Sequence, residues 1–117
     1  MLSYSAHEAE GVMIFTVEEP EGGEAPLNQR EWLYHTIEQR EDPRFAIDLG
    51  EINYLASSDI GFLVMLKRRI DLRKGKVALF RLDPYIVDIF RTMRIDKLFL
   101  FGTDLNDVIA KLSQPEA

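Results

Sequence analysis

Two adjacent serines, Ser57 and Ser58, come where a loop is expected to give way to a helix. At a helix N-terminus the first backbone N–H groups lack intrahelical acceptors, and the helix dipole favours negative charge. A phosphate of about −1.5 to −2 charge on such a serine could be held there without unfolding the helix. Alternatively, the two side chains only cap the helix. The residue types alone leave both interpretations open.

Side chains for other kinds of chemistry are sparse. The two histidines, His7 and His35, are isolated, and there is no cysteine. A metal site needs converging ligands, and a Ser-His-Asp arrangement needs a histidine near the serine. The sequence also lacks a glycine-rich phosphate loop and a Gly-x-Ser-x-Gly turn. We therefore expect no enzyme activity, no metal site and no cofactor.

Asp48, at the end of a predicted strand, raises one alternative, because receiver domains phosphorylate an aspartate at such a place. They also hold Mg²⁺ with an acidic pair after the first strand, and Glu18-Glu19 superficially fits. However, that strand is the second of a predicted hairpin. The lysine expected after the last strand is missing, since Phe101-Gly102-Thr103 stands there. A receiver domain is therefore disfavoured.

Composition narrows the class of protein further. The chain has 117 residues, of which 46% are hydrophobic, and this suits one globular domain. A net charge of −6 makes nucleic acid an unlikely partner. No window approaches the roughly 20 apolar residues that span a bilayer, and residues 1–4 do not resemble a secretion signal. We expect a cytoplasmic protein without membrane insertion. One basic cluster is interpreted as a solvated helix face: Lys67, Arg68, Arg69, Arg73, Lys74 and Lys76.

The hydrophobic periodicity predicts the order β-β-α-β-α-β-α-β-α. The predicted strands are residues 2–6, 12–17, 45–49, 77–82 and 98–101, and the predicted helices are about residues 28–40, 59–73, 84–94 and 103–112. Strands that alternate with helices indicate an α/β fold with a mixed, mostly parallel sheet of about five strands and about four helices. We expect one domain over residues 1–112 and a flexible C-terminal tail over residues 113–117.

Local signals predict where these elements begin and end. Asn28 and Glu31 form a capping-box-like pair, and Thr103 is expected to cap the last helix. Gly75 is expected to be a left-handed helix terminator. Asp83-Pro84 supplies a cap and a first-position proline. A loop is predicted over residues 18–26, and the loop at 50–58 should pack Ile52, Tyr54 and Leu55 onto the sheet. The expected buried positions include Leu63 in the second helix and, in the third, Ile86, Ile89, Phe90 and Met93.

The segment FAIDLGEINYLASSDIG, residues 45–61, resembles the STAS domain family of bacterial anti-sigma factor antagonists. That family has an apolar strand ending in Asp-Leu and, later, Asp-Ser-Ser-Gly-Leu-Gly opening a helix. Asp48-Leu49 matches the first motif, and residues 56–61 match the second. The glycine of Lys74-Gly75-Lys76 and the segment Ile95 to Phe99 agree with later motifs, so the resemblance covers most of the chain.

Two positions depart from the family motif. Ala56 replaces the aspartate before the serines, and Asp59 replaces the glycine after them. The resemblance places the phosphate acceptor at Ser57, with Ser58 as the second choice. Asp59 adds a negative charge beside the acceptor, which would repel phosphate unless Asp59 serves as a cap. The predicted partner-binding residues are Ala56, Ser58, Asp59, Ile60 and Gly61.

The resemblance implies a switch protein. Its unphosphorylated form would bind a serine kinase that also acts as an anti-sigma factor, and a phosphatase would reset it. A homodimer is also compatible with the family. The alternatives are an unphosphorylated scaffold of a stress-signalling assembly, an accessory subunit of a lipid-transport complex and an enzyme, for which no catalytic constellation is found.

Overall fold

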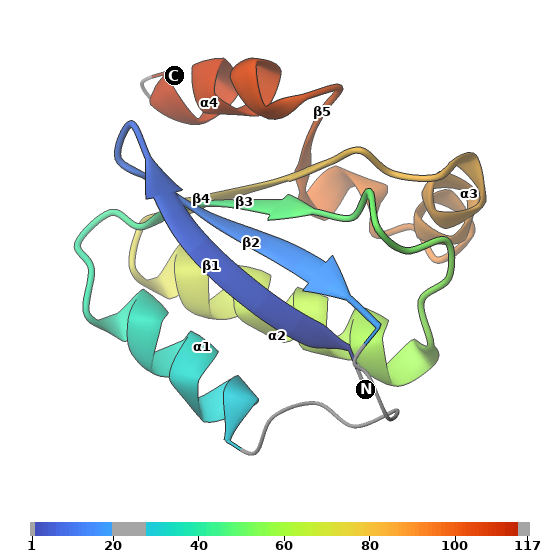
Figure 1. Cartoon of the computed structure of the whole chain (residues 1–117), viewed down its shortest axis with the longest axis horizontal. Coiled ribbons are helices and arrows are strands. Elements are labelled where there is room, and N and C mark those ends of the chain that lie inside the picture. The colour runs from blue at the N-terminus through green and yellow to red at the C-terminus, as the bar shows by residue number, and fades with distance from the viewer. Residues whose placement is uncertain (1, 20–27, 115–117) are drawn as a thin grey trace.

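The computed structural model describes residues 2–19 and 28–114 (Figure 1). Five strands form one sheet in the order β1-β2-β3-β4-β5, so that neighbours in sequence are neighbours in space. β1 and β2 are antiparallel, and the later pairs are parallel. This confirms the predicted mixed sheet. The strands are β1 Ser3–Ala9, β2 Val12–Glu18, β3 Arg44–Asp48, β4 Lys76–Phe80 and β5 Leu100–Gly102.

The turn between β1 and β2 consists of Glu10 and Gly11. Both residues have positive φ, 52° and 78°. Two-residue hairpin loops prefer this geometry because its twist matches that of the flanking strands. The hairpin therefore forms the antiparallel edge on which the parallel strands are built.

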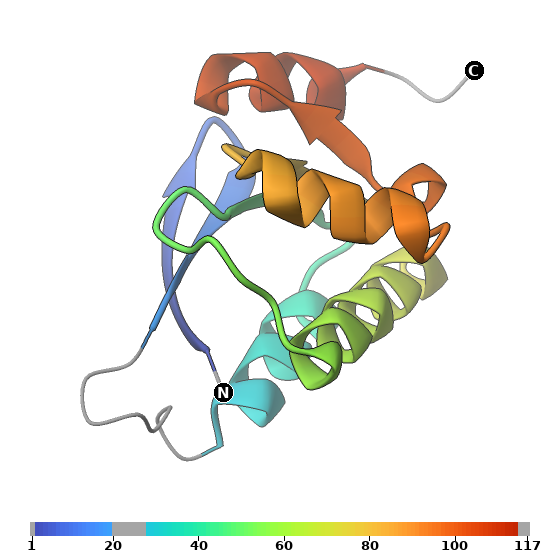
Figure 2. The same cartoon turned by 90° about the vertical axis from the view of Figure 1, so that its right-hand side faces the viewer.

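The helices lie on both faces of the sheet (Figures 1 and 2). They are α1 Gln29–Glu38, α2 Ser57–Leu72, α3 Pro84–Thr92 and α4 Leu105–Ser113, with a short 3-10 helix, η2, at Asp96–Leu98. The first three connect parallel strands, and crossovers of the usual right hand place them on one face. The last helix is not a crossover, and it covers the opposite face. The predicted number and order of elements are confirmed.

Two hydrophobic clusters follow from strand alternation. On one face, Phe15, Phe45 and Ile47 pack with the buried residues of α1, α2 and α3. On the other face, Ile14 and Ala46 pack with Val108 and Leu112 of α4. The three central strands, β2, β3 and β4, thus contribute buried residues to both clusters, and the middle of the sheet is buried on both sides.

The start of α1 differs from the prediction. Asn28 has left-handed φ and its side chain makes no capping hydrogen bond, so the capping box with Glu31 is wrong. Instead, Gln29 is buried at the outer edge of β1. Its Oε1 accepts from Tyr4 N at 2.9 Å, and its Nε2 donates to Leu2 O at 2.8 Å. The helix ends at Glu38, two residues before the predicted Arg40.

The end of α2 also corrects a prediction. Lys74, and not Gly75, adopts the left-handed conformation, with φ 58°. Lys74 N donates to Asp71 O and Gly75 N donates to Ile70 O, which is the Schellman pattern. Gly75 is required for space, because a Cβ there would lie 2.2 Å from the carbonyl oxygen of Pro43.

Two residues of the basic cluster make tertiary contacts and do not only form a solvated helix face. Arg69 of α2 pairs with Glu38 of α1 at 2.9 Å, and its guanidinium lies 3.8 Å from the ring centroid of Tyr34. Arg73 donates two hydrogen bonds to the carbonyl of Arg40. These contacts join α2 to α1 and to the segment that follows it.

The C-terminal elements are shifted slightly from the predicted positions. Residues 96–98 form η2, so β5 begins at Leu100 instead of residue 98. Asp104, and not Thr103, caps α4, because its Oδ1 accepts from Asp107 N at 2.9 Å. Ser113 is the last residue of α4. Residues 20–26 of the predicted loop and residues 115–117 of the predicted tail lie outside the described residues.

The start of α3 agrees with the prediction, but its apolar stripe is narrower. Asp83 caps the helix by accepting from Tyr85 N, and Pro84 is the first helical residue. Ile86 and Phe90 are fully buried. Ile89 is only partly buried and Met93 is 50% exposed, so these two predicted core positions lie at the margin of the core.

Candidate functional site

The predicted site lies at the start of α2. Ala56 is the N-cap residue, with an extended backbone, and Ser57 and Ser58 are the first two helical residues. Both serines are exposed. Their backbone N–H groups precede the first intrahelical hydrogen bonds, in which Asp59 N and Ile60 N donate to Ala56 O. The helix therefore begins two residues earlier than predicted, with both hydroxyls at its positive end.

Asp59 supplies the side chain that closes this helix start. Its carboxylate accepts from Ala56 N at 3.2 Å, and the residue is only 8% exposed. This is one half of a capping box, because the methyl side chain of Ala56 has no polar atom to accept the reciprocal bond. The interpretation that Ser57 and Ser58 cap the helix is thus wrong. Neither serine hydroxyl makes a hydrogen bond with any of residues 2–19 or 28–114.

Strand β1 supports the helix start from the core side. The ring of Tyr4 meets that of Phe62 edge-on, with centroids 5.7 Å apart. Burial raises the pKa of Tyr4, the negative charge of Asp59 raises it further, and Arg30 opposes the shift. The Tyr4 phenol is therefore held neutral beneath the first turn of α2, next to the charge of Asp59.

The loop that leads to α2 is anchored at its beginning. Asp48 Oδ1 accepts from Gly50 N at 2.9 Å, and its Oδ2 accepts from Arg81 at 2.9 Å. Gly50 leaves room for this pair, since a Cβ there would lie 2.5 Å from the Arg81 guanidinium carbon. The pair joins the carboxyl ends of β3 and β4, and it fixes the point from which the loop leaves the sheet.

This geometry also disfavours the receiver alternative. Both carboxylate oxygens of Asp48 are engaged, one by a backbone N–H and one by a guanidinium. Within the described parts of the chain, no three metal-ligating side chains come together. Arg81 was not recognised from the sequence. Its distant partner, 33 residues away, and its left-handed φ of 59° leave no local pattern.

The predicted partner-binding residues are not all surface residues. Ser58 and Gly61 are exposed and Ala56 is half-buried, whereas Asp59 and Ile60 are buried and support the surface from below. A Cβ at Gly61 would meet nothing within 4 Å, so the fold itself does not need glycine there.

The loop before α2 gives this surface an aromatic side chain. Ile52 and Leu55 pack inward, as predicted. Tyr54 does not, because it is 56% exposed. An exposed tyrosine in the loop and two exposed serines at the helix start are therefore found close together in the sequence, on either side of the N-cap.

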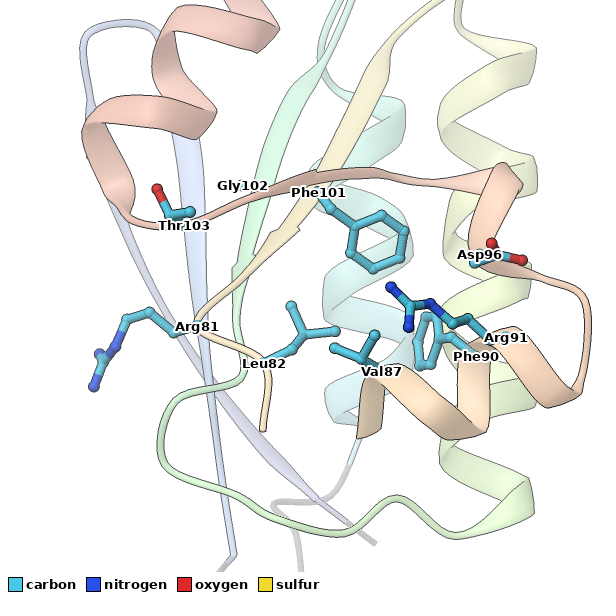
Figure 3. Close-up of a pocket in the computed structure, with 9 residues that line it drawn as sticks. All are labelled: Arg81, Leu82, Val87, Phe90, Arg91, Asp96, Phe101, Gly102 and Thr103. Atoms are coloured by element: carbon cyan, nitrogen blue, oxygen red, sulfur yellow. The ribbon is translucent and has the colours of Figure 1, made fainter. Parts of the chain in front are cut away.

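A separate cavity of about 460 Å³ opens between β4, α3 and β5 (Figure 3). Its floor is apolar, formed by side chains that include Leu82, Phe90 and Phe101. Arg91 points into this cavity and Arg81 points away from it (Figure 3). No sequence motif indicated the cavity, because its lining combines side chains of consecutive elements, between residues 81 and 103, that only the fold brings together.

None of the helices in the described residues combines the length and apolar character needed to cross a membrane. The framework of the site consists of the helix start, the loop before it, and the ends of β3 and β4.

Comparisons with known proteins agree with this framework. The STAS domain family model matches residues 3–108. No curated protein matched the sequence. Among solved structures, an anti-sigma-factor antagonist (STAS) domain protein from Planctomyces limnophilus superposes with a TM-score of 0.79 at 17% identity, over 96% of this chain and 99% of that one.

Two further structures show the same fold. A serine-to-glutamate variant of RsbS from Moorella thermoacetica gives a TM-score of 0.78 at 16% identity, over 93% of each chain. The unphosphorylated anti-sigma factor antagonist SpoIIAA gives 0.70 at 13% identity, over 92% of this chain and 94% of that one. The family model covers nearly the whole chain, and the similar structures superpose on most of it, so the chain belongs to the STAS domain family.

Proposed function

We propose that this chain is a protein-binding regulator of the anti-sigma factor antagonist type, and that Ser57 is its phosphate acceptor. One observation supports the proposal most directly. Ser57 and Ser58 expose unengaged hydroxyls at the first turn of α2, while the neighbouring Asp59 carboxylate is turned inward as a cap. Asp59 thus stabilises the helix start without occupying the surface that an added phosphate would need.

The switch would be electrostatic. A phosphate on Ser57 gains from the helix dipole and from the N–H groups of the first turn, so the fold can hold it. The same charge at a contact surface must be desolvated when a partner binds, and it repels acidic groups of that partner. Phosphorylation would therefore block binding without unfolding the domain.

The surface around the serines has the features of a small protein interface. Tyr54 provides an exposed aromatic anchor, a residue type that is enriched among energetically dominant interface residues. Ser58, Gly61 and Met65 follow one another at helical spacing along the outer face of α2, and each is exposed. Gly61 adds no side chain, so a partner could approach the helix backbone closely.

The partner would be a serine kinase that is also an anti-sigma factor, with a phosphatase to reset the switch, in the cytoplasm. The second candidate function uses the same surface without phosphorylation, as a scaffold or accessory subunit. It is favoured by Ala56, which replaces the family's aspartate at the N-cap. Phosphate incorporation distinguishes the two functions.

The test is intact-mass analysis after incubation with a candidate partner kinase and ATP, followed by site mapping. Wild type and Ser58→Ala should each gain one phosphate, and Ser57→Ala should gain none. Ser57→Asp should weaken binding to the same kinase, whereas Ser57→Ala should preserve it. No phosphate on any variant would favour the scaffold function. Phosphate on Ser58 alone would retain the switch and move its acceptor.

A further inference from the structure

A second surface lies at the other end of α2. A groove of about 400 Å³ opens where the carboxyl end of α2, the start of β4, η2 and the end of α4 meet. Figure 2 shows η2 beside the carboxyl end of α2, away from the loop that leads into this helix. Four lysines line the groove, each from a different element: Lys67, Lys76, Lys97 and Lys111.

This charge is unusual for the molecule, which carries 20 acidic and 14 basic side chains apart from histidine. Lys67 pairs with Asp71, and Lys111 pairs with Asp107 at 3.2 Å. Lys76 donates to the carbonyl oxygen of Gln114. Neither Lys76 nor Lys97 forms an ion pair with another described residue. Among the described residues, the groove thus keeps a positive charge in an acidic protein.

The groove also exposes apolar surface, next to a backbone N–H beyond the end of the β4–β5 ladder. Leu98 and Leu100 on its border are 41% and 40% exposed. β5 pairs with β4 only from Ala78 onward, so one backbone N–H of β4, that of Val77, lies beyond the ladder on the outer side. Lys76 N donates inward to Pro43 O, so Val77 N–H faces outward by strand alternation.

We propose that this groove binds an extended, acidic segment of a protein partner. Carboxylates of that segment would meet Lys76 and Lys97, its apolar side chains would cover Leu98 and Leu100, and one of its backbone carbonyls would accept from Val77 N–H. Charge complementarity and the exposed apolar border together favour this occupant. An anionic bilayer fits less well, because its surface cannot enter a concave groove.

The groove and the two serines lie at opposite ends of α2. α2 has 16 residues and is therefore about 24 Å long. A partner at the serine end of this helix and an acidic segment at its lysine end could be bound together. The inference does not depend on phosphorylation of Ser57.

The test uses a fluorescein-labelled peptide of alternating glutamate and valine, with a lysine–valine peptide as its counterpart. Backbone amide signals of residues 76–77 and 97–100 should shift with the acidic peptide, while those of residues 56–61 should not. Lys97→Glu should weaken binding about fivefold, and more at low salt, as expected for exposed charge pairs. Arg68→Glu makes the same charge change on α2 but outside the groove. It should leave affinity within about twofold of wild type.

Three results would overturn the proposal. The first is no shift of the groove amides at millimolar acidic peptide. The second is equal loss of affinity in Lys97→Glu and Arg68→Glu, which would indicate attraction by net charge alone. The third is binding of phosphatidylglycerol vesicles that Lys97→Glu abolishes, without peptide binding, which would identify a membrane surface instead.

Discussion

Single side chains at the helix start have roles that their sequence positions only partly indicate. The residues around Ser57 and Ser58 predict a helix start, and they offer Asp59 only as one alternative for its cap. Ala56 occupies the N-cap, and the carboxylate comes from Asp59, three residues later. Sequence patterns for capping rely on a polar N-cap residue, so a half capping box on alanine is not established by the pattern alone. The hydroxyl groups of Ser57 and Ser58 therefore do not cap the helix.

Tyr4 gives a pH-dependent prediction. Its folded-state pKa is raised above the usual 10.0, chiefly by burial and next by Asp59. In the unfolded chain the phenol ionises near pH 10, while in the folded chain it stays protonated. Stability from this group is therefore complete below about pH 10 and is lost as pH rises above it. The urea concentration at the midpoint of unfolding should decrease for wild type as pH is raised through about 10. In Tyr4→Phe this decrease should be smaller. An identical decline in both proteins would show that other groups cause it.

At the scale of elements, the periodicity predicted every strand and α-helix of the described residues but not the 3-10 helix η2, and the errors lie at the ends of the elements. Helix and strand ends depend on contacts with distant residues. Gly75 is an example: its backbone is not left-handed, and it is small because Pro43 crosses closely. A local pattern attributes such a glycine to turn geometry, since the crossing segment lies more than thirty residues earlier.

Two glycine substitutions should therefore have different costs. Gly75→Ala places a methyl group against the Pro43 backbone, which cannot move without disturbing β3, and should cost about 1–3 kcal/mol. Gly50→Ala meets only the tip of the Arg81 side chain, which can rotate away, and should cost less than about 1 kcal/mol. Chemical denaturation of the two variants compares them directly. The reverse ranking would mean that the Asp48–Arg81 pair is more important to stability than the close crossing.

The third helix offers a matched pair of core substitutions. Ile86 is fully buried, and Ile89 is only partly buried although it is three residues along the same helix. Ile86→Ala should destabilise by about 2–5 kcal/mol, as should Leu63→Ala in α2. Ile89→Ala should cost clearly less, because part of its side chain is already in contact with water. Equal denaturation midpoints for Ile86→Ala and Ile89→Ala would contradict the packing of α3.

At the scale of the whole molecule, the class of fold could be predicted because one alternation of strands and helices runs through the chain. What could not be predicted are the surfaces formed between distant elements. The groove at the carboxyl end of α2 combines four lysines from four elements, and the Asp48–Arg81 pair joins two strand ends. Such groupings depend on the sheet order and on side-chain directions, which periodicity does not specify.

Gln29 covers part of the exposed edge of the sheet, along β1. Its amide occupies Tyr4 N–H and Leu2 C=O, which would otherwise be available to another strand. Gln29→Ala should speed hydrogen exchange of the Tyr4 amide and promote self-association at high concentration. Hydrogen exchange and analytical ultracentrifugation measure the two effects, with the exposed Gln39→Ala as control. Unchanged exchange at Tyr4 would show that this bond protects little.

The sheet order has a consequence for how the protein is made. Because β1 to β5 are adjacent in the order of synthesis, each strand that leaves the ribosome finds its neighbour already present. No strand has to be inserted between two that are already paired, so the sheet can grow at one edge while translation continues. α4 is the last of the described elements to be made, and until α4 arrives one face of the nascent sheet stays uncovered. That interval is when a chaperone would have the most apolar surface to recognise.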